Sequence, residues 1–197
     1  MPYGTILVDM DGVLCDVVGG MLDELEHLTG VDMEKRPVIT DYALSGSLFE
    51  ANPTTSLESW NDAIRDTFNL DGFFFDLEPI GKAVEATREL VSEGWEVFLC
   101  TSPWPSSPSS YSDKQEWVAE HMPFIDLRNL IMTQDKSMVV GDVLIDDKPM
   151  EINRLRYNPV WTHVVFDTPY NWDHNTGFRV YDTQHTWISE INLALGR

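Results

Sequence analysis

Short apolar runs alternate along this chain with longer segments in which apolar residues recur every three or four positions. The short runs are typical of buried β-strands, and the longer segments predict helices with one buried face. The predicted strands cover residues 5–8, 96–100, 130–132, 143–145 and 163–166. Strands that alternate with helices predict an α/β fold, here a Rossmann-like parallel sheet with flanking helices.

The predicted helices have recognisable ends. The apolar face of the first is formed by Val17, Val18, Met21, Leu22, Leu25 and Leu28, and Gly30 can end it. Thr55 and Glu58 fit a capping box that begins a second helix, with Trp60, Ile64 and Phe68 on its buried face. Three more helices are expected, from Pro79 to about Ser92, around Lys114, and over 186–195. Residues 31–53 and 102–112 are expected to be irregular.

Polar residues directly follow three of the predicted strands. They are Asp9 and Asp11, Thr101 and Ser102, and Asp146 and Asp147. Sites in parallel sheets form beyond the carboxyl ends of the strands, so these side chains should meet. Carboxylates brought so close need a cation or a proton, and an all-oxygen site suits Mg²⁺. A carboxylate can also attack a phosphate ester, while a second one transfers protons.

The composition restricts the partners. A formal net charge of -20 opposes binding to nucleic-acid polymers and requires local positive charge if the substrate is a small anion. The chain shows no membrane span and no signal peptide, so we expect a cytoplasmic protein without a membrane partner. Cys15 and Cys100 are expected to be buried thiols rather than a disulfide framework. The sequence leaves both a monomer and a homodimer open.

Four segments resemble the motifs of haloacid dehalogenase (HAD) superfamily phosphatases. Val8-Asp9-Met10-Asp11-Gly12-Val13 resembles motif I, Leu99-Cys100-Thr101-Ser102 motif II, Lys114 motif III and Leu144-Ile145-Asp146-Asp147 motif IV. A closer resemblance, over about residues 5–170, is to the 5'(3')-deoxyribonucleotidases. It includes the stretch from Phe73 to Pro79, Cys100-Thr101-Ser102-Pro103, Thr133-Gln134-Asp135-Lys136, and the stretch from Leu144 to Pro149.

The resemblance implies a role for each motif residue. Asp9 would be the nucleophile and form an aspartyl-phosphate, and Asp11 would be the general acid and base. Magnesium would be bound by Asp9, Asp11, Asp147 and Asp146, with Asp147 the direct motif IV ligand and Asp146 supporting it. The phosphate would be held by Thr101, Ser102 and Lys114. Residues 1–14 and 79–197 would form the catalytic core, and 15–78 a small helical cap.

The resemblance also implies a substrate, a nucleoside monophosphate. The animal enzymes of the family carry an aromatic residue six positions after the second Asp, where this chain has Val17, so the base preference stays open. Val17 and residues 41–45 are the candidates for reading the base, with Tyr42 either stacking on it or packing in the cap. Lys114 could instead be a solvated helix residue, and residues 73–75 are expected to be core. Trp60 is expected in the cap core, and Trp104 near the substrate.

The sequence leaves two alternative functions open. A phosphatase of the same superfamily could act on sugar or other small phosphomonoesters, because the phosphate chemistry is shared across many leaving groups. A phosphate-accepting signalling module would also use Asp, Thr, Lys and Mg²⁺, but it lacks the Asp-x-Asp-Gly pattern after the first strand and the cap-sized insertion. A catalytically dead relative is opposed by the presence of every motif residue.

Overall fold

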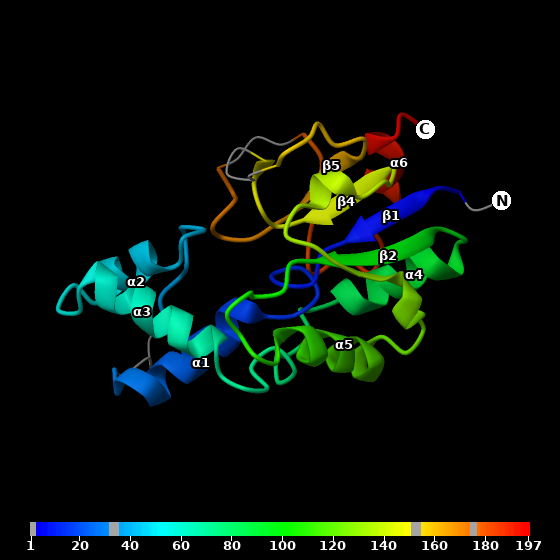
Figure 1. Ribbon diagram of the computed structural model, residues 1–197. Helices are drawn as coiled ribbons and strands as arrows, with labels where there is room; N and C mark the ends of the chain where they lie inside the picture. Colours follow the sequence, from blue (N-terminus) through cyan, green and yellow to red (C-terminus); the bar gives the residue numbers. More distant parts are fainter. Residues whose placement is uncertain (1–2, 32–35, 151–154, 174–176) are drawn as a thin grey trace.

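The computed structural model describes residues 3–31, 36–150, 155–173 and 177–197. They contain one parallel six-stranded sheet in the order β3-β2-β1-β4-β5-β6 (Figure 1). The strands are β1 (Thr5–Val8), β2 (Glu96–Thr101), β3 (Leu130–Met132), β4 (Val143–Asp146), β5 (Thr162–Phe166) and β6 (Arg179–Val180). The predicted α/β class and its five strands are confirmed, and β6 is an edge strand too short for its pattern to be recognised.

The centre of the sheet is fully buried. Val8 of β1 pairs with Leu99 of β2 on one side and with Ile145 of β4 on the other. All three are fully buried, and such continuous apolar strands are typical of parallel sheets that are covered on both faces. This register brings the carboxyl ends of β1, β2 and β4 to one edge of the sheet.

The two faces of the sheet are covered differently. Buried residues of α4 (Ala83–Ser92), α5 (Ser110–His121) and α6 (Ile188–Ala194) share one apolar cluster with Ile6 and Val8 of β1. On the opposite face, Leu7 and Leu144 pack against Trp161 in a smaller cluster. The 3₁₀ helix η2 (Lys136–Met138) is tied to that side, because the Trp161 indole donates to the carbonyl of Lys136. A second 3₁₀ helix, η1 (Leu127–Asn129), precedes β3.

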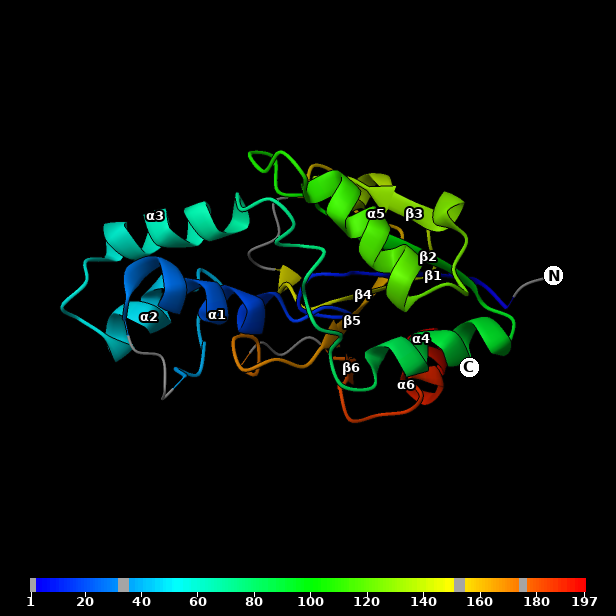
Figure 2. The ribbon, with the colours of Figure 1, turned by 90° about the horizontal axis from the view of Figure 1, so that it is seen from below.

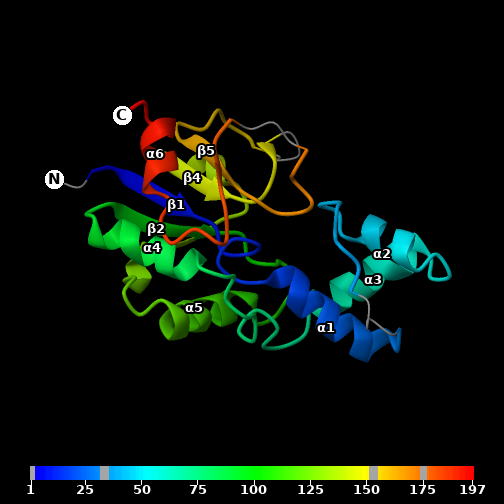
Figure 3. The ribbon, with the colours of Figure 1, turned by 180° about the vertical axis from the view of Figure 1, so that it is seen from behind.

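Three helices lie apart from the sheet, beyond the carboxyl ends of its strands (Figures 1 and 3). These cap helices are α1 (Val17–Thr29), α2 (Ser45–Ala51) and α3 (Leu57–Phe68). Trp60 of α3 is fully buried, as are Met21 and Leu25 of α1, and all three belong to the same apolar cluster as Ile6 and Val8 of β1. The predicted burial of Trp60 is therefore confirmed. Figure 2 shows α3 extending alongside α1, with the sheet and its helices at the other end of the molecule.

Several helix ends differ from the prediction. Helix α2 lies within the segment 31–53 that was expected to be irregular. Helix α3 is capped by Ser56, whose side chain accepts from the Ser59 amide, rather than by Thr55 and Glu58. Helix α4 begins at Ala83 and not at Pro79, because the chain first pairs with the loop after β1, where the Ile80 amide donates to the Leu14 carbonyl.

Two further differences concern α5 and α1. Helix α5 begins at Ser110, inside the segment expected to be a loop. Leu28, predicted on the buried face of α1, is 49% exposed, whereas Gly30 ends that helix in the left-handed conformation as predicted. Cys15 and Cys100 are buried free thiols. Within the described residues, no helix combines the length and the apolar character that crossing a membrane requires.

Candidate active site

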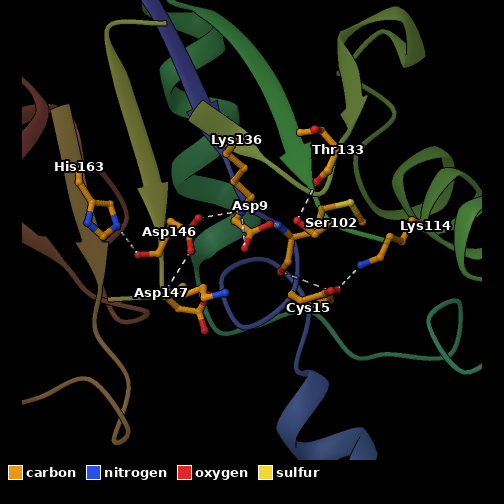
Figure 4. Close-up of polar contacts among 12 residues, drawn as sticks. Asp9, Cys15, Ser102, Lys114, Thr133, Lys136, Asp146, Asp147 and His163 are labelled. Carbon is orange, nitrogen blue, oxygen red and sulfur yellow. Dashed lines mark hydrogen bonds and ion pairs between the residues drawn. The ribbon is translucent and has the colours of Figure 1, made fainter. Parts of the chain in front are cut away.

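Three carboxylates meet where β1 and β4 end (Figure 4). Asp9 follows β1, Asp146 is the last residue of β4, and Asp147 comes next. The Asp9 amide donates to the Ile145 carbonyl, which continues the strand pairing into the site. The chain then turns at Gly12, where φ is +74° and an added Cβ would lie 2.6 Å from both Asp147 Oδ2 and the Tyr170 hydroxyl. The turn therefore requires a glycine.

The three carboxylates form a candidate metal site. Asp9, Asp146 and Asp147 are all buried and can each offer one oxygen within 4.8 Å of the others. Burial, together with the charges of its neighbours Asp146 and Asp11, raises the pKa of Asp9 above its usual range. Burial and the charges of Asp146 and Asp9 likewise raise the pKa of Asp147. So much negative charge in one volume favours a bound cation.

Lys136 of η2 forms ion pairs with two of these carboxylates. Its Nζ lies 2.8 Å from Asp9 Oδ2 and 2.7 Å from Asp146 Oδ2. Burial alone would lower the pKa of Lys136, but the Asp146 and Asp9 carboxylates outweigh burial and raise it. Sequence reasoning gave Lys136 no role, although it ends the Thr133-Gln134-Asp135-Lys136 segment on which the family resemblance was partly based. That segment was the available signal.

Lys114 forms an ion pair with a different carboxylate, that of Asp11. It is 1% exposed, so the alternative of a solvated helix residue is wrong. Its ammonium contacts the Asp11 carboxylate and lies 4.6 Å from the centre of the Phe74 ring. The Cys15 thiol also donates to Asp11. The predicted role of Lys114 as a phosphate ligand stays a prediction, since the structure shows it beside the proposed general acid.

The two motif IV aspartates have different surroundings. Both oxygens of Asp146 accept hydrogen bonds, Oδ2 from Lys136 and Oδ1 from the Lys148 amide at 2.8 Å. Asp147 Oδ2 accepts from the Tyr170 hydroxyl at 2.5 Å. Burial and the Asp147 carboxylate raise the pKa of Tyr170, so the phenol stays protonated and remains a donor. Sequence reasoning did not single out Tyr170.

The motif II residues lie at the end of β2. Thr101 is fully buried, and its hydroxyl has no hydrogen-bond partner in the part of the chain that the structure describes. The Ser102 hydroxyl donates to the Thr133 carbonyl at 2.8 Å. Thr101 therefore keeps a donor that a phosphate oxygen could accept, whereas the Ser102 hydroxyl is already engaged.

A cavity of about 450 Å³ lies between the carboxylates and the cap helices. The cap contributes Val17, Tyr42 and four residues of α3, namely Asn61, Ile64, Arg65 and Phe68. The core contributes Asp9, Asp11, Asp146 and Asp147 together with Lys136, Ser102 and Trp104. The structure thus brings most of the predicted site residues to one cavity, whereas Thr101 and Lys114 are not among its described lining residues.

The aromatic residues near the cavity were only partly anticipated. Trp104 lines it, as expected, and packs edge-on against Phe68 at 5.2 Å between ring centres. Phe73 and Phe74 are buried, as expected for core residues, although Phe74 also lines the cavity. Phe75, also expected in the core, is only half-buried. Tyr42 is 37% exposed, and its ring meets Tyr170 edge-on at 5.8 Å.

Solved structures share this fold. A HAD family hydrolase from Deinococcus radiodurans R1, with bound phosphate and sodium, superimposes with a TM-score of 0.55 at 17% identity, covering 99% of this chain and 96% of that one. A family IA HAD hydrolase from Entamoeba histolytica gives 0.51 at 11% identity, covering 98% and 99%. At these identities the likeness concerns the fold. The chain therefore has the fold that these HAD hydrolases share, with an acidic site at the carboxyl ends of its central strands.

Sequence comparison identifies the family to which the chain belongs. The model of the family "5' nucleotidase, deoxy (Pyrimidine), cytosolic type C protein" matches residues 4–193. The human "5'(3')-deoxyribonucleotidase, cytosolic type" is 32% identical over 167 residues, 84% of this chain and 81% of the relative. The human "5'(3')-deoxyribonucleotidase, mitochondrial" is 33% identical over 171 residues, 84% and 71%. The chain belongs to this 5' nucleotidase family, so it is a HAD-type nucleotide phosphatase.

Proposed function

We propose that this chain hydrolyses deoxyribonucleoside 5'- or 3'-monophosphates with the help of Mg²⁺, through an aspartyl-phosphate on Asp9. The observation that carries the proposal is the cluster of three buried carboxylates beneath a cavity of about 450 Å³. The floor of this cavity carries the carboxylates that can take part in phosphate hydrolysis. Its cap side is lined by apolar and aromatic side chains. This combination suits a phosphate joined to a nucleoside.

The donor set fits magnesium. All three side chains offer oxygen, which Mg²⁺ prefers to nitrogen or sulfur. Asp147 is supported as the direct ligand, because its Oδ1 accepts no hydrogen bond among the described residues, whereas both oxygens of Asp146 do. When bound, the ion would neutralise the carboxylates and the phosphate charge that otherwise keeps Asp9 from attacking.

The residues themselves would carry two chemical steps. Asp9 attacks phosphorus, the bond to the nucleoside oxygen breaks, and Asp11 gives that oxygen its proton. Asp11 then takes a proton from water, which attacks the phosphorus and breaks its bond to Asp9. Lys136 offsets negative charge on Asp9, and the free hydroxyl of Thr101 can bind a phosphate oxygen. Free phosphate and unchanged Asp9 result.

The substrate assignment is supported by the relatives, whose names specify deoxyribonucleotides. The aromatic groups of Tyr42, Phe68 and Trp104 along the cavity favour a nucleoside over a sugar alone, because aromatic rings can stack on a base. The phosphoacceptor module is opposed by the cap helices that cover the carboxylates. A cytoplasmic location and a homodimer stay predictions, and sedimentation of the purified chain tests the latter.

A phosphate-release assay tests the proposal. Deoxyribonucleoside monophosphates should be hydrolysed faster than ribonucleotides or sugar phosphates, with turnover lost in EDTA and restored by Mg²⁺. Asp9→Asn should remove turnover while leaving the thermal unfolding curve cooperative, because an amide is too weak a nucleophile for phosphorus. Full activity in EDTA, or near wild-type rates for Asp9→Asn, would refute the mechanism. Preference for sugar phosphates would refute the substrate class.

A further inference from the structure

We infer that Tyr170 is a positioning residue for the metal ligand Asp147. It lies outside the four motifs, in the segment that follows β5. The inference rests on the proposed function, because it assumes that Asp147 binds Mg²⁺. In this inference, the segment from Thr168 to Asn171 holds Asp147 in the orientation that the ion requires.

The side chain of Asp147 is held from one side. The Tyr170 hydroxyl donates to Oδ2 at 2.5 Å, and both residues are buried. Without this bond, repulsion from the neighbouring Asp9 and Asp146 carboxylates would favour turning Asp147 away from them. With Oδ2 engaged, Oδ1 remains for the metal. Hydrogen bonds to a ligating carboxylate orient it in this way and strengthen metal binding.

The backbone of Asp147 is held by Asn171, the residue that follows Tyr170. Asn171 is fully buried, and its Nδ2 donates to the carbonyls of Asp147 at 2.7 Å and Phe166 at 2.8 Å. Its Oδ1 accepts from Arg179 Nη1 at 2.7 Å. The amide therefore joins the ends of β4 and β5 to β6. Tyr170 is thereby attached to a rigid part of the sheet, which allows its hydroxyl to fix Asp147.

Two further contacts show how closely Tyr170 is fitted. A Cβ on Gly12 would come within 2.6 Å of the Tyr170 hydroxyl, so the loop after β1 packs directly on it. The Tyr170 ring also meets Tyr42 at the cap side of the cavity. One residue thus contacts the proposed metal ligand, the turn beside the nucleophile, and the cap.

Tyr170→Phe tests the inference, because it removes only the hydroxyl. Isothermal titration with MgCl₂ alone should show a Kd about 10- to 100-fold above wild type, the usual effect of losing such a partner. The Mg²⁺ concentration for half-maximal activity should rise by a similar factor, while kcat recovers largely at saturating Mg²⁺. Tyr157→Phe is the matched control, because Tyr157 is 60% exposed and is not among the described residues that line the cavity. It should bind Mg²⁺ as wild type does.

Thermal unfolding without metal separates positioning from a structural role. A variant whose metal-free melting temperature stays near wild type and whose Kd rises supports the inference. An unchanged or lower Kd overturns it alone, with the proposed function intact. A variant that loses cooperative unfolding, or whose kcat stays low at saturating Mg²⁺, also overturns it, because Tyr170 would then support the fold or the chemistry. A wild-type chain that binds no Mg²⁺ would overturn the proposed function as well.

Discussion

Two buried lysines form ion pairs with different carboxylates of the site. Lys136 lies against Asp9 and Asp146, whereas Lys114 lies against Asp11. Of these two lysines, only Lys136 is among the described residues that line the cavity. The two lysines should therefore differ in function although they share residue type and burial.

At the residue scale, Lys136→Met should lower kcat for a nucleotide by about 10²- to 10³-fold, the usual cost of losing one preorganised donor to the reacting charge. Lys114→Met should weaken binding of inorganic phosphate, measured as product inhibition, much less than Lys136→Met does. Both variants remove one buried ammonium, so each serves as the control for the other. Equal losses of phosphate affinity would restore the original assignment of Lys114 to the phosphate.

At the scale of elements, the cap loop before α2 and the helix α3 form the side of the cavity opposite the carboxylates. Tyr42 lies there between Tyr170 and Lys148, whose Nζ is 5.3 Å from the centre of its ring. The ring keeps enough exposure to meet a base as well as its neighbours. Because its location satisfies both sequence hypotheses, stacking on the base and packing in the cap, only a substrate comparison separates them.

Tyr42→Ala should reduce kcat/KM for nucleotides by about 5- to 150-fold, since stacking on a base contributes roughly 1–3 kcal/mol. Hydrolysis of a small phosphate ester without a base should change little. Phe49→Ala is the matched control, because Phe49 is a partly exposed aromatic residue of α2 that is not among the described cavity residues. Equal losses on both substrates would mean that Tyr42 only supports the cap.

At the scale of the whole molecule, a formal charge of -20 on 197 residues repels itself in the folded state. Raising ionic strength from about 0.01 M to about 1 M shortens the screening length from roughly 30 Å to 3 Å. The melting temperature should therefore rise with salt, by about 2–4 °C for each kcal/mol of relieved repulsion. Sodium chloride and choline chloride should act alike in calorimetry. A flat or falling melting temperature would contradict the prediction.

The strands and the acids that follow them could be predicted from the sequence, because both depend on local order. Apolar runs such as Thr5–Val8 identify buried strands without knowledge of their partners. Asp9 and Asp146 then had to meet, because the ends of parallel strands share one edge. Helix starts were less predictable, as α4 shows, since its first turn is displaced by pairing between Ile80 and Leu14.

What the tertiary structure decided is which side chains support those acids. The only local signal for Lys136 was its place at the end of the Thr133–Lys136 segment. Tyr170 carries no local signal of its role, because a tyrosine in a loop resembles an ordinary surface residue. Lys136 and Tyr170 reach Asp146 and Asp147 only after η2 and the segment after β5 pack against the end of β4. The sequence by itself therefore determined the strands of the sheet, which follow from the hydrophobic pattern. It also determined the acids at the edge of the sheet, which directly follow those strands in the chain. The cations and hydrogen-bond donors around those acids depend on contacts between distant segments, which only the folded chain provides.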